Sequence, residues 1–141
     1  MSYKTEQQVI DSGSTGLVSW GGAGNYYSTS GANFSIIRAG SGRIKGQRIT
    51  WTGSGETVTL TANKSYYIGY SATNTLLAVD ASTIYSADPA VFEANLLNLY
   101  TNTMCVLYQA WFNGLVYVVT QEDHPYAYPT VTSISAHFRE G

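Results

Sequence analysis

The feature that most constrains this chain is a run of short apolar segments between residues 34 and 79, each separated from the next by turn-forming residues. Glycine, serine, threonine and asparagine fill the breaks, as in Gly40–Gly42, Gly53–Gly55 and Ala72–Asn74. Strands at this even spacing, with turn signals between them, are typical of antiparallel β-structure. Proline is absent from Met1 to Asp88, so nothing there blocks ladder hydrogen bonds. We therefore predict a mainly β fold, an antiparallel meander or sandwich of short strands.

Two further patterns inside this run make the prediction more specific. A two-residue loop at Gly46-Gln47 would form a type II′ turn, with Lys45 opposite Arg48 and Ile44 opposite Ile49. In the segment Thr57–Thr61 apolar and threonine residues alternate, which places Val58 and Leu60 on the buried face and the threonines outside.

One short helix is expected after the run. Asp88 is a good N-cap residue and Pro89 suits the first helical position. Phe92, Leu96 and Leu99 follow at helical spacing and would share one buried face.

A hairpin is predicted from Met104 to Thr120, because Asn113-Gly114 is a strong signal for a type I′ turn. That turn pairs Phe112 with Leu115 and Trp111 with Val116, and it makes both faces of the hairpin mostly apolar. A hairpin with one solvated face would be polar at alternate positions. This hairpin is therefore either central in a two-layer domain, with the helix on one side, or part of a subunit interface. The candidate interface residues are Tyr108, Trp111, Phe112 and Tyr117.

The length of 141 residues fits one domain. We divide it into a polar N-terminal segment with a Gly-rich loop, residues 1–33, and a β-rich domain, residues 34–141. The chain ends soon after a predicted final strand at Thr130–Ala136, so we expect it to be a piece of a longer polypeptide.

Composition narrows the function classes. Only 11% of the residues are charged while 44% are hydrophobic, and the net charge is −2. This low charge predicts a surface covered by serine, threonine, asparagine and tyrosine. The basic residues of the central run are interrupted by glycine and isoleucine, so we expect no nucleic-acid partner, although a phosphate-binding face is a minor alternative; they are Arg38, Arg43, Lys45, Arg48 and Lys64. No apolar run is long enough for membrane insertion.

Little in the sequence favours catalysis or a cofactor. The single cysteine, Cys105, lies in an apolar run and is expected to be a small core residue. Glu122–His124 is the one place where carboxylates adjoin a histidine, but sequence neighbours point in different directions. We therefore predict no enzyme activity, no metal and no cofactor, with catalysis at His124 as the remote alternative.

Exposed aromatic rings are the better candidates for binding. Sugars stack on aromatic faces and hydrogen-bond to neutral amide and hydroxyl groups, which this chain has in number. The candidate glycan-binding residues are Tyr26, Tyr27, Trp51, Tyr66 and Tyr67. The competing interpretation is that these rings fill a thin core or a subunit contact.

Part of the chain resembles a β-module of tail fibres, tailspikes and baseplate-associated proteins of tailed bacteriophages. The resemblance lies in Ile37–Ile49, which follows the pattern IxAGxGxIxGxxI, then in Val58–Leu60 and in Tyr66–Tyr70. Val118–Tyr126 is similar to a segment that follows such modules in tailspike-like proteins.

The resemblance implies a homotrimeric, non-catalytic part of a virion fibre that is assembled in the bacterial cytoplasm. Its partners would be itself, other phage tail proteins and a host surface polysaccharide, and no catalytic residue carries over. The expected function is a structural or attachment domain of a tail fibre or tailspike. The alternative is a lectin-like carbohydrate-binding module.

Overall fold

The computed structural model describes residues 15–20 and 26–121. These residues form three antiparallel sheets and one α-helix, which confirms the predicted mainly β fold. The strands are β1 (Gly16–Trp20), β2 (Tyr27–Ser30), β3 (Asn33–Ile36), β4 (Gly40–Ile44), β5 (Gln47–Trp51), β6 (Glu56–Thr59), β7 (Lys64–Tyr70), β8 (Leu76–Asp80), β9 (Cys105–Phe112) and β10 (Tyr117–Gln121). The helical segments are the 3-10 turn η1 (Ala81–Thr83), the helix α2 (Pro89–Asn98) and the π-helical turn η2 (Leu99–Thr103).

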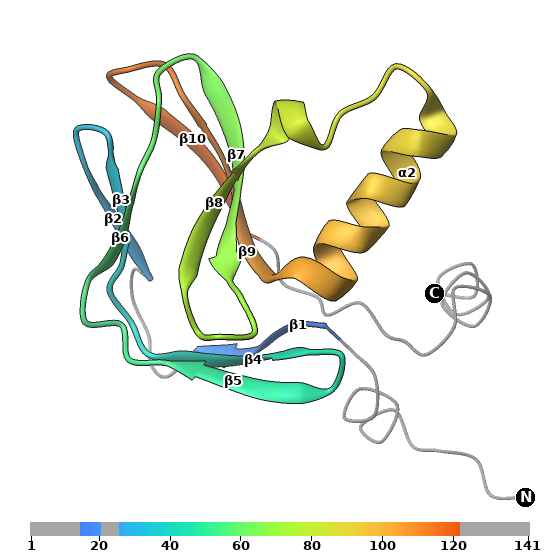
Figure 1. The fold of residues 1–141 in the computed structure, drawn as a ribbon. Helices are drawn as coiled ribbons and strands as arrows, with labels where there is room; N and C mark the ends of the chain where they lie inside the picture. Colours follow the sequence, from blue (N-terminus) through green and yellow to red (C-terminus); the bar gives the residue numbers. More distant parts are fainter. Residues whose placement is uncertain (1–14, 21–25, 122–141) are drawn as a thin grey trace, which may run out of the picture.

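A four-stranded sheet in the order β10-β9-β7-β8 is the centre of the fold. The sheet β2-β3-β6 lies on one side of it and α2 lies on the other, while the sheet β1-β4-β5 closes one end (Figure 1). Strands from before residue 34 take part fully, because β1 pairs with β4 and β2 pairs with β3.

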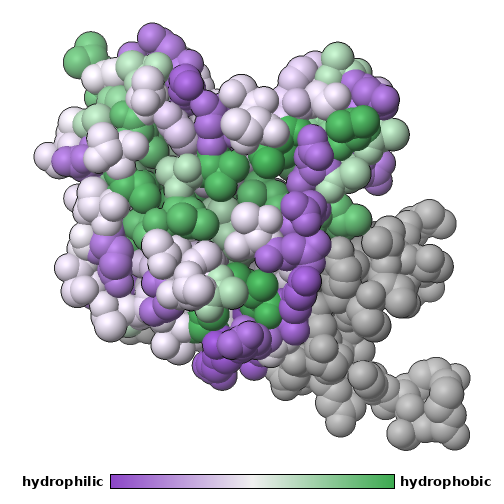
Figure 2. Space-filling model, in the orientation of Figure 1, coloured by the Kyte–Doolittle hydropathy of each residue, from purple (hydrophilic) through white to green (hydrophobic). Residues whose placement is uncertain are grey.

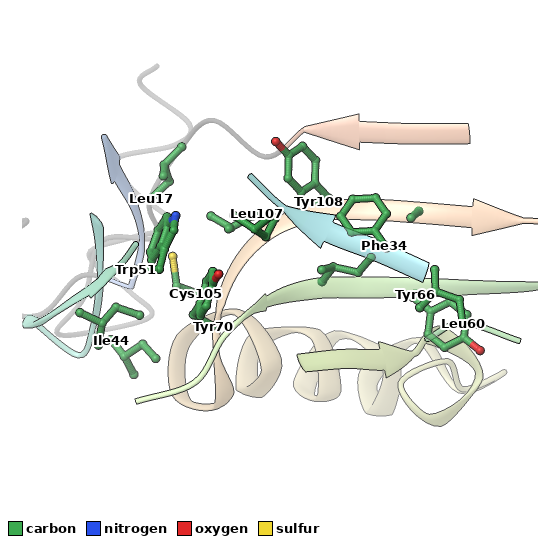
Figure 3. Close-up of a cluster of buried hydrophobic side chains, with 14 of the residues drawn as sticks. Leu17, Phe34, Ile44, Trp51, Leu60, Tyr66, Tyr70, Cys105, Leu107 and Tyr108 are labelled. Carbon is green, nitrogen blue, oxygen red and sulfur yellow. The ribbon is translucent and has the colours of Figure 1, made fainter. Parts of the chain in front are cut away.

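The main core lies where the three sheets meet. Figure 3 shows Trp51, Tyr70 and Cys105 grouped at one end of it, Phe34 and Tyr108 in the middle, and Leu60 with Tyr66 at the other end. A second, smaller core lies on the opposite face of the central sheet, under η2, where Leu99 and Met104 are buried. The central sheet is thus apolar on both faces, as the sequence predicted for its β9–β10 hairpin.

Several local predictions are confirmed. Val58 and Leu60 face inward while the neighbouring threonines are exposed. The Asp88 carboxylate accepts a hydrogen bond from the backbone N–H of Ala90 at 3.0 Å, and Pro89 is the first residue of α2. The helical path then continues past α2 as η2, which buries Leu99.

The Gly-rich stretch was predicted to be a loop, and this is wrong for its second half. Residues 27–36 form the β2–β3 hairpin, with Ser30 opposite Asn33. Gly31 has a φ of 58°, the backbone conformation that glycine permits at the first position of a type II′ turn. The first part of the stretch, residues 21–25, lies outside the described residues.

The turn between β4 and β5 is also one residue earlier than predicted. Arg43 pairs with Arg48 and Ile44 with Gln47, so the loop is Lys45-Gly46 and not Gly46-Gln47. Both loop residues have positive φ, 51° and 82°, which is the geometry of a type I′ turn. The backbone N–H of Lys45 donates a hydrogen bond to Thr15 Oγ1 at 2.9 Å. The like-charged cross-strand pair is consequently Arg43 and Arg48.

The β9–β10 hairpin exists, but its predicted register is wrong by two residues. Phe112 pairs with Tyr117, and residues 113–116 form a four-residue loop. The Asn113 side chain accounts for the longer loop, because its Oδ1 accepts hydrogen bonds from the backbone N–H groups of Leu115 and Val116, each at 2.8 Å. A shift of two leaves the alternation of the two faces unchanged, so the register shift by itself moves no strand residue to the other face.

One residue changes face because of a β-bulge between β7 and β9. Ile68 pairs with Tyr108 and Gly69 pairs with Val106, so Leu107 has no partner of its own. The extra residue turns Leu107 into the main core beside Tyr108, and it is fully buried there.

Candidate functional site

The described residues contain no candidate metal centre: no group of three or more His, Cys, Asp or Glu side chains comes together in them. The Glu122–His124 group lies outside the described residues. The basic residues of the central run do not form one face either. Arg43 and Arg48 are cross-strand partners and share one face of the sheet β1-β4-β5, whereas Lys64 lies on β7 in the central sheet and is bound to Asp80.

Three of the predicted glycan-binding residues belong to the core. Trp51 stacks on Tyr70 with ring centroids 4.6 Å apart. The Tyr66 hydroxyl accepts a hydrogen bond from the backbone N–H of Thr61 at 2.9 Å. Tyr67 meets the Tyr100 ring edge-on, under η2. A sugar stacks on an exposed ring face, and these three rings have none, because tertiary packing covers them.

Tyr26 and Tyr27 do lie at the surface, and Trp20 joins them. Tyr26 stacks on Trp20 with ring centroids 4.5 Å apart and an interplanar angle of 10°. Tyr27 stacks on Phe34 at 4.9 Å. All three surface rings are partly exposed and rest against the main core. Sequence reasoning missed Trp20, although it directly precedes the Gly-rich stretch that carries both tyrosines.

The outer face of the neighbouring sheet β2-β3-β6 is neutral and polar. The strand register places its hydroxyl and amide side chains in two rows across the sheet, Ser28–Ser35–Thr57 and Ser30–Asn33–Thr59. Within the rows, the Ser35 and Thr57 hydroxyls are 2.6 Å apart and Thr59 donates a hydrogen bond to Asn33 Oδ1 at 2.9 Å. This face offers hydrogen-bonding groups without a charge.

The predicted interface residues separate into two groups. Tyr108 and Phe112 are buried in the main core, and Tyr117 is only partly exposed because it stacks on Phe112 at 4.4 Å. Trp111 points to the other face of the sheet, toward the side of α2, and is 39% exposed. Of the four candidate interface residues, Trp111 is the one whose side chain is largely available for contact with another subunit.

The structure adds three apolar residues to Trp111. Val118 lies directly opposite it across the strands, and the loop carries Leu115 and Val116. These side chains are strongly exposed, with Leu115 at 90%. We call this set the hairpin patch: Trp111, Leu115, Val116 and Val118. Sequence reasoning missed Leu115 and Val116 because the predicted two-residue turn placed them inside the strand.

The helix covers the central sheet only in part. Leu96, Leu99 and Tyr100 pack on Tyr67 and Val106, toward one end of the sheet. The hairpin patch lies beyond this cover. In Figure 2 the outline of the molecule is notched between the helix and the strands, and hydrophobic residues show on the surface below the notch.

Three titratable groups in the described part of the chain have strongly shifted pKa values, each with a structural cause. A backbone hydrogen bond from Ser82 and an ion pair with Lys64 lower the pKa of Asp80 to about 2. Burial raises the pKa of Cys105 to about 12. Burial and the adjacent Glu56 carboxylate raise the pKa of Tyr70. The causes are burial, hydrogen bonds and neighbouring charges within the fold, so these pKa shifts indicate structural roles.

No family model, curated protein or solved structure matches this chain. Over the part that the structure describes, no helix has the length and apolar character needed to cross a membrane.

Proposed function

We propose that this chain is a structural and attachment domain of a bacteriophage tail fibre or tailspike, located in the virion and joined to other tail proteins. It acts as a homo-oligomer, with the three copies that the resemblance implies, and it supports binding to a host surface polysaccharide. It does so without catalysis.

The observation that carries the proposal is the central sheet, which is apolar on both faces but is covered more fully on one face than on the other. The β2-β3-β6 and β1-β4-β5 sheets cover one face, whereas η2 and the end of α2 cover only part of the other. The apolar part of the less covered face can be buried by another layer of protein, such as a second copy of the chain. Repeated contacts between copies would give a fibre its resistance to shear.

The native mass in solution tests the assembly part of the proposal. We expect sedimentation equilibrium to give the mass of a trimer. A strict monomer at the highest soluble concentration would contradict it.

A carbohydrate-binding module is the second candidate, and the Trp20–Tyr26 stack favours it. A stacked, partly exposed aromatic pair beside a neutral face of hydroxyl and amide groups has the chemistry of a glycan platform. The two candidates are compatible, because an attachment domain can also bind sugar.

Binding to a glycan array and to purified bacterial surface polysaccharides tests this second candidate. We expect Tyr26→Ala to abolish binding, and Tyr85→Ala to leave it unchanged. Tyr85 is the matched control because it is an exposed tyrosine whose ring contacts Phe92 of α2 instead. A wild-type protein that binds none of these glycans would rule the module out.

A further inference from the structure

We propose that the hairpin patch, with the edge of β10 that no other described strand pairs with, is the surface through which copies of this chain associate. The occupant of the patch is a second copy of the chain. This inference rests on the homo-oligomeric part of the proposed function and adds the residues that make the contact.

The first argument is the position of β10. Among the described strands, β10 pairs with β9 alone, so its other edge presents backbone N–H and C=O groups. Proteins that keep an edge strand unpaired usually protect it with lysine, proline or an inward-pointing charge. β10 has the sequence YVVTQ and carries none of these. An unprotected edge of this kind favours the addition of another strand.

The second argument is charge. Residues 104–121, which contain the whole hairpin, include no Asp, Glu, Lys or Arg. On the adjacent strand β7, Lys64 is bound to Asp80 at 2.9 Å. A surface that is neutral throughout meets an identical copy without like-charge repulsion, whereas a charged partner gains nothing from it. The patch therefore complements a second copy better than a charged macromolecule.

The third argument is size. Four exposed apolar side chains, one of them a tryptophan, offer on the order of a few hundred Å². The patch and the β10 edge of one copy, together with the surface that they cover on the next copy, approach the lower range of specific interfaces, about 1,200 Å² in total. A head-to-tail contact of this kind can close into the trimer of the proposed function. Trp111 supplies the aromatic anchor that such interfaces commonly have. The size of the patch therefore fits a contact with another copy of the chain.

The test compares the native mass of the wild-type protein with that of charged variants, by sedimentation equilibrium at matched concentrations. Val118→Lys places a charge on the exposed face of β10, and Leu115→Lys places one in the loop. Tyr85→Lys and Val91→Lys are the controls, since both are exposed apolar residues outside the hairpin. Far-UV circular dichroism and the urea midpoint verify that each variant is folded. Leu115→Lys preserves the test if Val118→Lys does not fold, because Leu115 is nearly free of contacts.

We expect the wild-type protein and both controls to be oligomers, and both hairpin variants to lose at least tenfold in association constant. If the hairpin variants keep the wild-type mass, the inference is overturned while the homo-oligomeric part of the proposed function stands. If the wild-type protein is a monomer, the inference and the homo-oligomeric part of the proposed function are both overturned.

Discussion

Gly69 and Cys105 meet backbone to backbone at the β-bulge between β7 and β9. A Cβ atom placed on Gly69 would lie 1.9 Å from the carbonyl oxygen of Cys105. The close approach exists because Leu107 is the extra residue of the bulge and shifts the ladder. Glycine at position 69 therefore allows the bulge, and the bulge in turn adds Leu107 to the core.

Gly69→Ala is expected to destabilise the fold strongly. The new methyl group collides with backbone atoms, which cannot rotate away as a side chain can, so the loss in unfolding free energy should be about 3 kcal/mol or more. Urea denaturation gives the value from the midpoint. Ser28→Ala is the control, because Ser28 is an exposed residue on the outer face of β2 and alanine fits its extended backbone. Equal midpoints for the two variants would show that the strands do not approach as described.

Lys45→Asn is expected to stabilise the protein by about 0.5 kcal/mol, because asparagine tolerates the left-handed conformation that a type I′ turn requires. Lys45 is exposed, and the hydrogen bond to Thr15 uses its backbone N–H, so the substitution keeps this hydrogen bond. Thermal or urea unfolding measures the change. The same substitution would destabilise a protein whose turn was Gly46-Gln47, because asparagine would then lie in a strand.

Signals confined to a few neighbouring residues predicted this fold well. The alternation around Val58 and the cap at Asp88 are local, and both appear as expected. The β4–β5 turn was misplaced because a lysine, and not a glycine, is its first positive-φ residue. The β9–β10 turn was lengthened by a side-chain cap at Asn113, which competes with the type I′ turn.

The candidate site was predicted less well because exposure depends on long-range packing. Trp51 and Tyr66 are residue types that often form binding surfaces. Here they are buried, because strands from distant parts of the chain pack on them. The bulge at Leu107 likewise follows from the pairing of β9 with β7, which are separated by the helix. Trp20 became part of the aromatic surface only through its stacking on Tyr26. No local pattern carries this information.

The Cys105 thiol is expected to be unreactive in the folded protein. The thiolate is the reactive form, and burial raises the pKa of Cys105 to about 12 while closing access to the side chain. Labelling with a chromogenic disulfide reagent at pH 8 should therefore proceed at the rate of unfolding. In concentrated urea the reagent should modify one thiol per chain at once. Fast labelling without denaturant would contradict the burial of this residue.

Stability should decrease in acid partly through Asp80. An unfolded aspartate has a pKa of about 3.9, and the hydrogen bond from the Ser82 backbone and the ion pair with Lys64 lower the pKa of Asp80 to about 2 in the folded state. Because the folded pKa is the lower one, the stabilisation is present above about pH 4 and is lost as the pH falls toward 2.

Asp80→Asn isolates this contribution, since asparagine can still cap η1 but carries no charge. The difference in unfolding free energy between wild type and variant should be constant above about pH 5 and shrink below about pH 4. Lys64→Met should raise the Asp80 pKa only in part, because the Ser82 hydrogen bond, which is the larger cause, remains. A carboxyl titration followed by NMR measures this directly, and a wild-type midpoint near 4 would show that neither partner holds the Asp80 carboxylate.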